Sequence, residues 1–429
     1  MKKISKIVAL SLGFVVAICA RSWAGEDAAL SLDAAVEEAL HNNPQIQSAY
    51  HAWKAAEQRI VTATALPDPM MGYTYTGERT SARDGAMEEE YEIGQEIPFP
   101  GKRHLAGLAA RDESRGMKEN YEMVRREVIR QTKSVYYDLF WVDQAAAIVN
   151  DQKALLQDLE TIALRRYETH QSPQQDALRT NLEKQELNER LLMLGQQRKS
   201  LQARLNSLLN RPADQPIKKT DEMAPPTFDY SLDQVMGMAN DLRPEIRMAK
   251  FSVSQAEKQT ALAKMDLLPD FTLRYNYIDR TTDMTGPLED AWEGMVEINV
   301  PIWFGKQRAQ ILEAQADLRS RQGSLQDMKN KTAFEVQEAY FMVKSYQDIL
   351  SLYNVSLLPQ SEQTYKITKI GYETGSNDFA DVIDAQRKYL QVRVAYYRAF
   401  ADYHQSISML EGVVGRDLKD FSRSEEGGR

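Results

Sequence analysis

Hydrophobic and polar residues alternate with a period of two in four short parts of the chain. These parts are residues 71–76, 90–97, 271–277 and 292–300. One face of each carries tyrosine, tryptophan or aliphatic residues, and the other carries mainly threonine, glutamate or asparagine. The alternation predicts four β-strands with one apolar face. Strands between lipid and water have this pattern, and so do the strands of a soluble, half-buried sheet.

Long segments with few helix-breaking residues flank these strands. Residues 102–167 contain no proline, and a continuous helix of that size would be about 100 Å long. Residues 306–370 contain Pro359, which predicts a kink or a local loosening near residues 355–358. Residues 32–65 and 379–414 are also expected to be helical. An ordinary coiled-coil hairpin would show the same apolar spacing.

Short polar turns join the long helices in pairs. The segment 371–378 reads Gly-Tyr-Glu-Thr-Gly-Ser-Asn-Asp, and we expect Gly375 to take the positive φ that ends one helix. Ser376 and the two residues after it offer side-chain oxygens to the next helix start. Asp381 and Asp384 then share one face of that helix. Thr169 and His170 lie in a similar turn about 205 residues earlier.

The two halves of the chain repeat each other. Ser31-Leu32-Asp33 recurs as Ser231-Leu232-Asp233, Leu66-Pro67-Asp68 as Leu268-Pro269-Asp270, and Gly101-Lys102 as Gly305-Lys306. The offset drifts only from 200 to 205 residues, so both halves should have the same fold. We therefore divide the chain into a first repeat at 25–210, a proline-rich linker at 211–230, a second repeat at 231–416 and a disordered tail at 417–429.

The start of the chain has the features of a secretory signal peptide. Three lysines precede an apolar run at residues 7–20, and small residues precede an expected cleavage site after Ala24. The single cysteine, Cys19, lies in this segment, and Ile18 before it disfavours a lipid-attachment site. After residue 24 no run of 18 apolar residues occurs, which excludes a helical membrane protein.

Composition and charge narrow the possible functions. The net charge is −9 and no basic stripe is present, so nucleic acid is not an expected partner. The five histidines show no metal-ligand spacing, and the methionines fit packing better than a copper site. Phosphate-binding loops, dinucleotide fingerprints and nucleophile elbows are absent. We expect neither an enzyme nor a bound metal or cofactor.

Four strands cannot close a barrel on their own. Open sheet edges inside a bilayer would leave backbone donors unpaired, at a cost of several kcal/mol each. Two copies would give eight strands around a filled interior, whereas three copies give twelve, which could leave a wet passage. If the strands lie in a membrane, the chain must therefore form an oligomer.

These features together resemble the TolC family of outer-membrane efflux proteins. The resemblance rests on the duplication, the Pro-Phe-Pro-Gly-Lys motif at 98–102, the segment 357–360 and, above all, the second turn with residues 381–386. It spans residues 31–416. The form of the Pro-Phe-Pro-Gly-Lys motif is similar to that in members that work with heavy-metal pumps.

The resemblance implies a mainly α-helical fold with a small antiparallel β part. It implies a homotrimer with a twelve-stranded β-barrel in the outer membrane of a Gram-negative bacterium and an α-helical tunnel in the periplasm. It also implies docking of the helical tips to a periplasmic adaptor and an inner-membrane pump. The expected function is passive efflux of small molecules or metal ions. A conduit for type I protein secretion and a periplasmic structural coiled-coil protein are the alternatives.

The resemblance also assigns roles to the residues at the turns. The counterparts of Asp381 and Asp384 line the periplasmic constriction in the family. The alternative is that these are solvated acids favoured by the helix dipole. The tip that docks to the adaptor would comprise Tyr372, Thr374, Gly375, Ser376, Thr169 and His170. The first turn departs from the pattern, with His170 at the position of Gly375 and Arg179 at that of Asp384, so the two hairpins are not expected to be equivalent.

Overall fold

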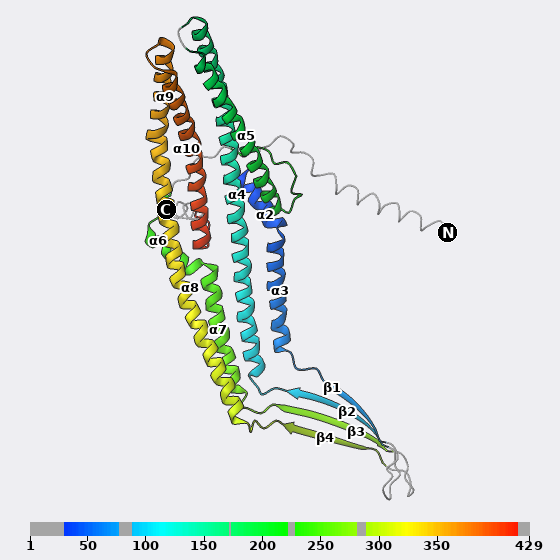
Figure 1. Cartoon of the computed structure of the whole chain (residues 1–429). Helices are drawn as coiled ribbons and strands as arrows, with labels where there is room; N and C mark the ends of the chain where they lie inside the picture. Colours follow the sequence, from blue (N-terminus) through cyan, green and yellow to red (C-terminus); the bar gives the residue numbers. More distant parts are fainter. Residues whose placement is uncertain (1–29, 77–87, 171–172, 222–227, 281–288, 419–429) are drawn as a thin grey trace, which may run out of the picture. The chain divides into compact units, whose positions relative to one another are not determined.

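The computed structural model describes residues 30–76, 88–170, 173–221, 228–280 and 289–418. Within these residues, long helices accompany one four-stranded sheet (Figure 1). In chain order the elements are α2 (Leu32–Asn42), α3 (Pro44–Thr64), β1 (Met70–Thr76), β2 (Glu88–Ile97), α4 (Lys102–Glu168), α5 (Gln174–Leu208), α6 (Leu232–Leu242), α7 (Pro244–Met265), β3 (Phe271–Arg280), β4 (Ala291–Ile298), α8 (Phe304–Leu352), the π-helix η1 (Tyr353–Leu357), α9 (Leu358–Thr374) and α10 (Phe379–Val414). The predicted signal peptide, Cys19 and most of the predicted tail lie outside the described residues.

The order of elements confirms the duplication. Two helices, two strands and a long helical hairpin occur in each half of the chain. The strands and the long helices begin and end close to the predicted residues. Tyr353–Leu357 forms the local loosening expected before Pro359, as a π-helical turn in which the Leu358 amide bonds to the Tyr353 carbonyl.

The prediction of one helix over residues 32–65 was wrong. Asn43 has an extended backbone (φ −68°, ψ 123°) and separates α2 from α3. Arg243 has the same conformation between α6 and α7. Proline follows both residues, and its ring disfavours the helical conformation of the preceding residue. The helix therefore ends and a new one begins with proline at its first position, where the missing amide costs nothing.

One compact unit comprises, among the described residues, 30–43, 128–170, 173–221, 228–229 and 341–409. It contains the hairpin of α4 and α5 and the hairpin of α9 and α10 (Figure 1). The ammonium of Lys184 on α5 lies 2.8 Å from Glu160 on α4, and Tyr365 on α9 stacks on Tyr389 of α10. Between the helices lies a core whose members include Leu156, Leu159, Leu187, Leu194, Tyr372, Phe379, Val382 and Leu390.

The second compact unit comprises, among the described residues, 44–76, 88–127, 230–280, 289–340 and 410–418. Its sheet is antiparallel with the strand order β1-β2-β3-β4. The central pair joins the two halves of the chain, because β2 comes from the first repeat and β3 from the second. β1 and β4 are the two edges, and each has a partner strand on one side only.

The two faces of the sheet differ as the alternation predicted. The aromatic side chains Tyr73, Tyr275 and Trp292 are 46 to 73% exposed in the single chain. On the other face Arg274 forms ion pairs with Glu92 at 2.9 Å and Glu297 at 3.1 Å. The apolar face therefore has no cover from the described residues of its own chain.

Candidate functional site at the hairpin tips

The tip between α9 and α10 is a tight, glycine-dependent turn. Gly375 has φ +82°, which confirms the predicted left-handed conformation. Its amide bonds to the Tyr372 carbonyl at 3.1 Å, and the Ser376 amide bonds to the Gly371 carbonyl at 2.7 Å. These two bonds satisfy carbonyl groups that the end of α9 would otherwise leave without donors.

The side chain of Asn377 approaches the backbone of Gly371 closely. The amide group of Asn377 folds over it, so that an added Cβ at position 371 would lie 2.7 Å from Asn377 Oδ1. Real Cβ contacts do not come so close, and any larger residue here would push Asn377 away. The first hairpin has Arg166 at the equivalent position.

The tip between α4 and α5 also contains a residue with a left-handed backbone conformation, but this residue is not glycine. His170 has φ +61°, and its amide bonds to the Tyr167 carbonyl at 3.0 Å. For a residue with a Cβ this conformation costs roughly 1 to 2 kcal/mol. The two turns thus share a backbone conformation at His170 and Gly375, although only the second has the residue that favours it.

Tyr372, in the last turn of α9, contacts residues of α4, α5 and α10. Its side chain is 2% exposed, and its hydroxyl donates to Asp176 Oδ2 on α5 at 3.3 Å. Arg166 at the end of α4 donates to the Tyr372 carbonyl and lies 4.6 Å from the centre of its ring. Phe379 packs against the ring edge at 5.4 Å. The second tip is therefore attached to both helices of the first hairpin.

Tyr167, the counterpart of Tyr372 in the first repeat, has a different environment. Its side chain is 44% exposed, whereas that of Tyr372 is buried. The sequence predicts Tyr372 at the tip but gives no sign that Arg166 and Asp176 are its partners. Both belong to the first turn region, but the sequence does not indicate which residues of one hairpin contact the other.

Asp176 carries the unusual electrostatics of the site. It is only 8% exposed. Burial raises the pKa of its carboxyl, while the Tyr372 hydrogen bond and the charges of Arg179 and Arg166 act in the opposite direction. The carboxylate is thus held where desolvation disfavours its charge, next to two cationic side chains.

Asp381 and Asp384 lie together on the exposed face of α10. Both side chains are exposed, whereas Val382 and Ile383 between them pack into the core. The carboxylate of Asp381 accepts a hydrogen bond from the Asp378 amide at 3.3 Å, as a cap at the start of a helix does. In a single chain, therefore, both acids are exposed and Asp381 caps the helix, as the alternative interpretation expects. Their assignment to a constriction remains a prediction.

Near this acidic face, α10 is tied to α5 by an ion pair. The guanidinium of Arg387, three residues after Asp384, binds the carboxylate of Glu183, and this hydrogen bond raises the pKa of Arg387. The pair adds a contact at the surface between α5 and the helix that carries both aspartates.

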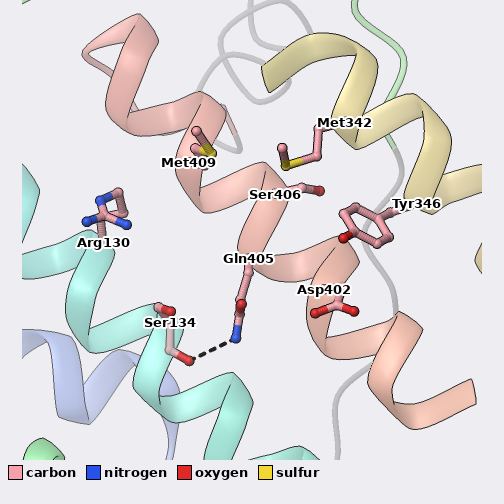
Figure 2. Close-up of a pocket in the computed structure, with 8 residues that line it drawn as sticks. All are labelled: Arg130, Ser134, Met342, Tyr346, Asp402, Gln405, Ser406 and Met409. Atoms are coloured by element: carbon pink, nitrogen blue, oxygen red, sulfur yellow. Dashed lines mark hydrogen bonds between the residues drawn. The ribbon is translucent and has the colours of Figure 1, made fainter. Parts of the chain in front are cut away.

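A small cavity lies in the same compact unit, away from the tips. It has a volume of about 160 Å³ and is lined by residues of α4, α8 and α10, among them the thioethers Met342 and Met409 (Figure 2). Across it, Gln405 donates to the Ser134 carbonyl at 3.1 Å. Elsewhere too, the described part of the chain holds no group of three His, Cys, Asp or Glu side chains placed to bind a metal ion.

None of the described helices combines the length and the hydropathy needed to cross a membrane.

Comparison with known sequences identifies a related family. Residues 235–416 match the family described as outer membrane efflux protein. A segment of 61 residues is 33% identical to the cobalt-zinc-cadmium resistance protein CzcC of Cupriavidus metallidurans. That alignment spans 14% of this chain and 15% of CzcC.

Comparison with solved structures extends the likeness to nearly the whole chain. CusC shares 15% identity with a TM-score of 0.78, over 90% of this chain and 92% of CusC. The outer membrane protein VceC of Vibrio cholerae shares 17% identity with a TM-score of 0.75, over 90% of this chain and 96% of VceC. The CmeC outer membrane channel of Campylobacter jejuni shares 15% identity with a TM-score of 0.76, over 95% and 93%. The fold is thus one that outer-membrane channels use.

Proposed function

Because residues 235–416 match the outer membrane efflux protein family and the fold is shared with outer-membrane channels, we propose that the chain is a member of the TolC family and the outer-membrane channel of a tripartite efflux system. In this role it passively conducts small molecules or metal ions from a periplasmic adaptor and an inner-membrane pump to the exterior. The protein resides in the outer membrane of a Gram-negative bacterium and extends into the periplasm. The proposal rests on the fold shared with outer-membrane channels over at least nine-tenths of the chain.

The sheet supports a trimer as the functional form. Its apolar face is exposed, and the edges β1 and β4 have unpaired backbone groups on their outer sides. Three copies give twelve strands, in which every edge is paired and the apolar faces meet lipid. The charged face with Arg274 and its glutamate partners then lines a wet interior.

The hairpin tips support a docking and gating role. Thr374, Gly375 and Ser376 are exposed at the second turn, and Thr169 and His170 are exposed at the first. We assign these residues, together with the buried Tyr372 that supports the second turn, to the surface that meets the adaptor. Release of Tyr372 from Asp176 and Arg166 would loosen the second turn from the first hairpin, which is a first physical step towards opening the passage.

Asp381 and Asp384 are assigned to the constriction of the assembled channel. When three chains close around one axis, the two exposed acids of each chain place six carboxylates in a ring. Rings of acidic side chains select cations in channels. Crowding of like charges also disfavours simultaneous ionisation of all six groups.

One sequence relative indicates which class of cargo the channel conducts. The name of CzcC states resistance to cobalt, zinc and cadmium. The similarity to it therefore favours metal ions over small molecules as the cargo. A strain lacking the protein should then be sensitive to these cations and should regain tolerance when the gene is restored. Normal metal tolerance with increased sensitivity to hydrophobic drugs would move the cargo to small molecules, and a loss of a secreted protein would favour type I secretion.

The function itself is tested with the purified protein. We expect a detergent-stable trimer in the outer-membrane fraction that conducts ions across a planar bilayer. A monodisperse, water-soluble monomer obtained without residues 1–24 would contradict the channel and would support the periplasmic coiled-coil protein.

A further inference from the structure

The junction between the sheet and the helices contains a buried ion pair that links the two repeats. Lys102 begins α4, its side chain is 10% exposed, and its Nζ lies 2.9 Å from both carboxylate oxygens of Asp270. The same ammonium donates to the Leu268 carbonyl at 3.2 Å, and the Phe99 amide donates to Asp270 at 2.7 Å. The Gly-Lys motif of the first repeat thus binds the Leu-Pro-Asp motif of the second.

The duplication provides a second copy of each motif, and within one chain these second copies do not bind each other. Lys306 corresponds to Lys102, and Asp68 corresponds to Asp270. Both side chains are exposed. Within the part of the chain that the structure describes, neither the Lys306 ammonium nor the Asp68 carboxylate has a hydrogen-bond or ion-pair partner.

The aromatic side chain near Lys102 is partly covered, whereas those near Lys306 are exposed. Phe99, just before Lys102, is partly buried and stacks on Phe271 with 6.5 Å between ring centres. The residues before Lys306 lack such a cover, since Trp303 is 72% exposed and Phe304 is 71% exposed. The second junction therefore presents an apolar surface and an unpaired charge at the end of an edge strand.

The register of the sheet shows which strand would cover this surface. In the two hairpins Met71 lies opposite Ile93 and Leu273 lies opposite Val296, so Ile93 and Val296 are equivalent positions. In the central pair Ile93 lies opposite Tyr275, whose equivalent on β1 is Tyr73. If an edge pair copies the central pair, Val296 of β4 lies opposite Tyr73 of β1.

In the proposed trimer, β4 of one subunit pairs antiparallel with β1 of the next. We propose that this pairing has the register of the central pair and that Lys306 binds Asp68 across the interface. In this register Val296 faces Tyr73 and Ile298 faces Met71. The inference rests on the proposed trimer and adds to it the residues that join its subunits. Each subunit interface then repeats the contact between the two repeats inside one chain.

The proposed register keeps the apolar faces of neighbouring strands on the same side of the sheet. Val296, Ile298, Met71 and Tyr73 all belong to the apolar faces of their strands, so apolar side chains meet on one side of the extended sheet. A shift by one residue would place apolar residues of one strand beside polar residues of the other. The same pairing closes both free edges at once, because every subunit offers one β1 and one β4.

Cysteine pairs test the register directly. In the double variant Met71→Cys/Ile298→Cys the two Cα atoms should lie about 4.5 to 5.5 Å apart across the interface, which suits a disulfide. We expect covalently linked dimers and trimers on non-reducing gels after mild oxidation of the detergent-solubilised protein. The single variants should give no linked dimers or trimers. Any linked species that they do form would show disulfides that involve Cys19 or two copies of the same cysteine.

A matched control changes only the position on β4. In Met71→Cys/Gly294→Cys the second cysteine is four residues, or about 13 Å, from the proposed partner. An added Cβ at Gly294 meets nothing within 4 Å, so the substitution is tolerated sterically. Efficient linkage of this pair, or of neither pair in a protein that is trimeric by native mass, would overturn the register while leaving the trimer intact. A monomer in all variants would remove the proposed channel as well.

The ion pair is tested separately by exchanging its charges. Lys306→Asp or Asp68→Lys alone should lower the temperature at which the detergent-solubilised trimer dissociates, because each variant places like charges together. The double variant Asp68→Lys/Lys306→Asp should recover most of the loss, since opposite charges face each other again. Unchanged dissociation in both single variants, or no recovery in the double variant, would overturn the pairing of Lys306 with Asp68.

Discussion

The hydroxyl of Tyr372 donates a hydrogen bond to Asp176 at 3.3 Å, and this bond joins helices from the two halves of the chain. The contact is buried, and Arg166 holds the same tyrosine through its carbonyl and its ring. Breaking these contacts would convert the packed state of the tip into a released state. The equilibrium between them is what a partner protein could shift by binding one state better than the other.

Tyr372→Phe should weaken the packed state. It removes one donor from a buried carboxylate and leaves the ring in place, so the expected loss is about 1 kcal/mol, or about fivefold in the equilibrium. The measurement is the open probability of single channels in a planar bilayer, which should rise. Tyr167→Phe is the matched control, because that tyrosine is exposed in the first tip, and it should leave the channel unchanged. Equal behaviour of the two variants would show that the hydrogen bond to Asp176 does not hold the tip.

The packed tip should also be favoured by moderate acid. Burial raises the pKa of Asp176, so the packed state binds its proton more tightly than a state in which the carboxyl is solvated. Lowering the pH through this raised pKa therefore stabilises the packed state, and the effect levels off below the solvated value of about 3.9. Open probability should fall over this range, and Asp176→Asn should abolish that dependence. A pH response that persists in the asparagine variant would assign it to other groups.

Gly375→Val should damage the tip without affecting assembly. The left-handed backbone at position 375 costs a residue with a Cβ roughly 1 to 2 kcal/mol, and a β-branched side chain adds crowding. Export should fall in cells that contain normal amounts of trimer in the outer membrane. Gly195→Val on the exposed face of α5 is the control, because an added Cβ there meets nothing within 4 Å. Normal export by the Gly375 variant at matched protein levels would remove this turn from the docking surface.

Asp381→Ala/Asp384→Ala should change the selectivity of the channel. If the six carboxylates form a ring, the parent channel prefers cations and is blocked by multivalent cations added on the tip side. The double variant should conduct better and lose both the preference and the block. Glu168→Ala/Glu373→Ala removes as many exposed acids from the ends of α4 and α9 and serves as the control. Block and conductance identical to the parent would place Asp381 and Asp384 away from the passage.

The sequence by itself determined the features that depend on neighbouring residues. Alternation marked all four strands, the absence of proline marked α4, and the glycine at 375 marked a left-handed turn. Each of these follows from the steric preferences of a few consecutive residues. The helix break at Asn43, before Pro44, also depends on neighbouring residues. The prediction of one helix over residues 32–65 overlooked it because helical apolar spacing continues on both sides of the proline.

Tertiary structure alone decided how equivalent residues differ. Tyr167 and Tyr372 occupy the same position in two similar turns, yet only Tyr372 is buried, because Arg166 and Asp176 of the other hairpin pack on it. Lys102 and Lys306 likewise share a motif, and of the two only Lys102 reaches an aspartate among the described residues of its own chain. A repeated sequence gives both copies the same local preferences. Which copy is covered depends on the chain segment that packs beside it, and contacts between residues about 200 positions apart form only when the whole chain folds.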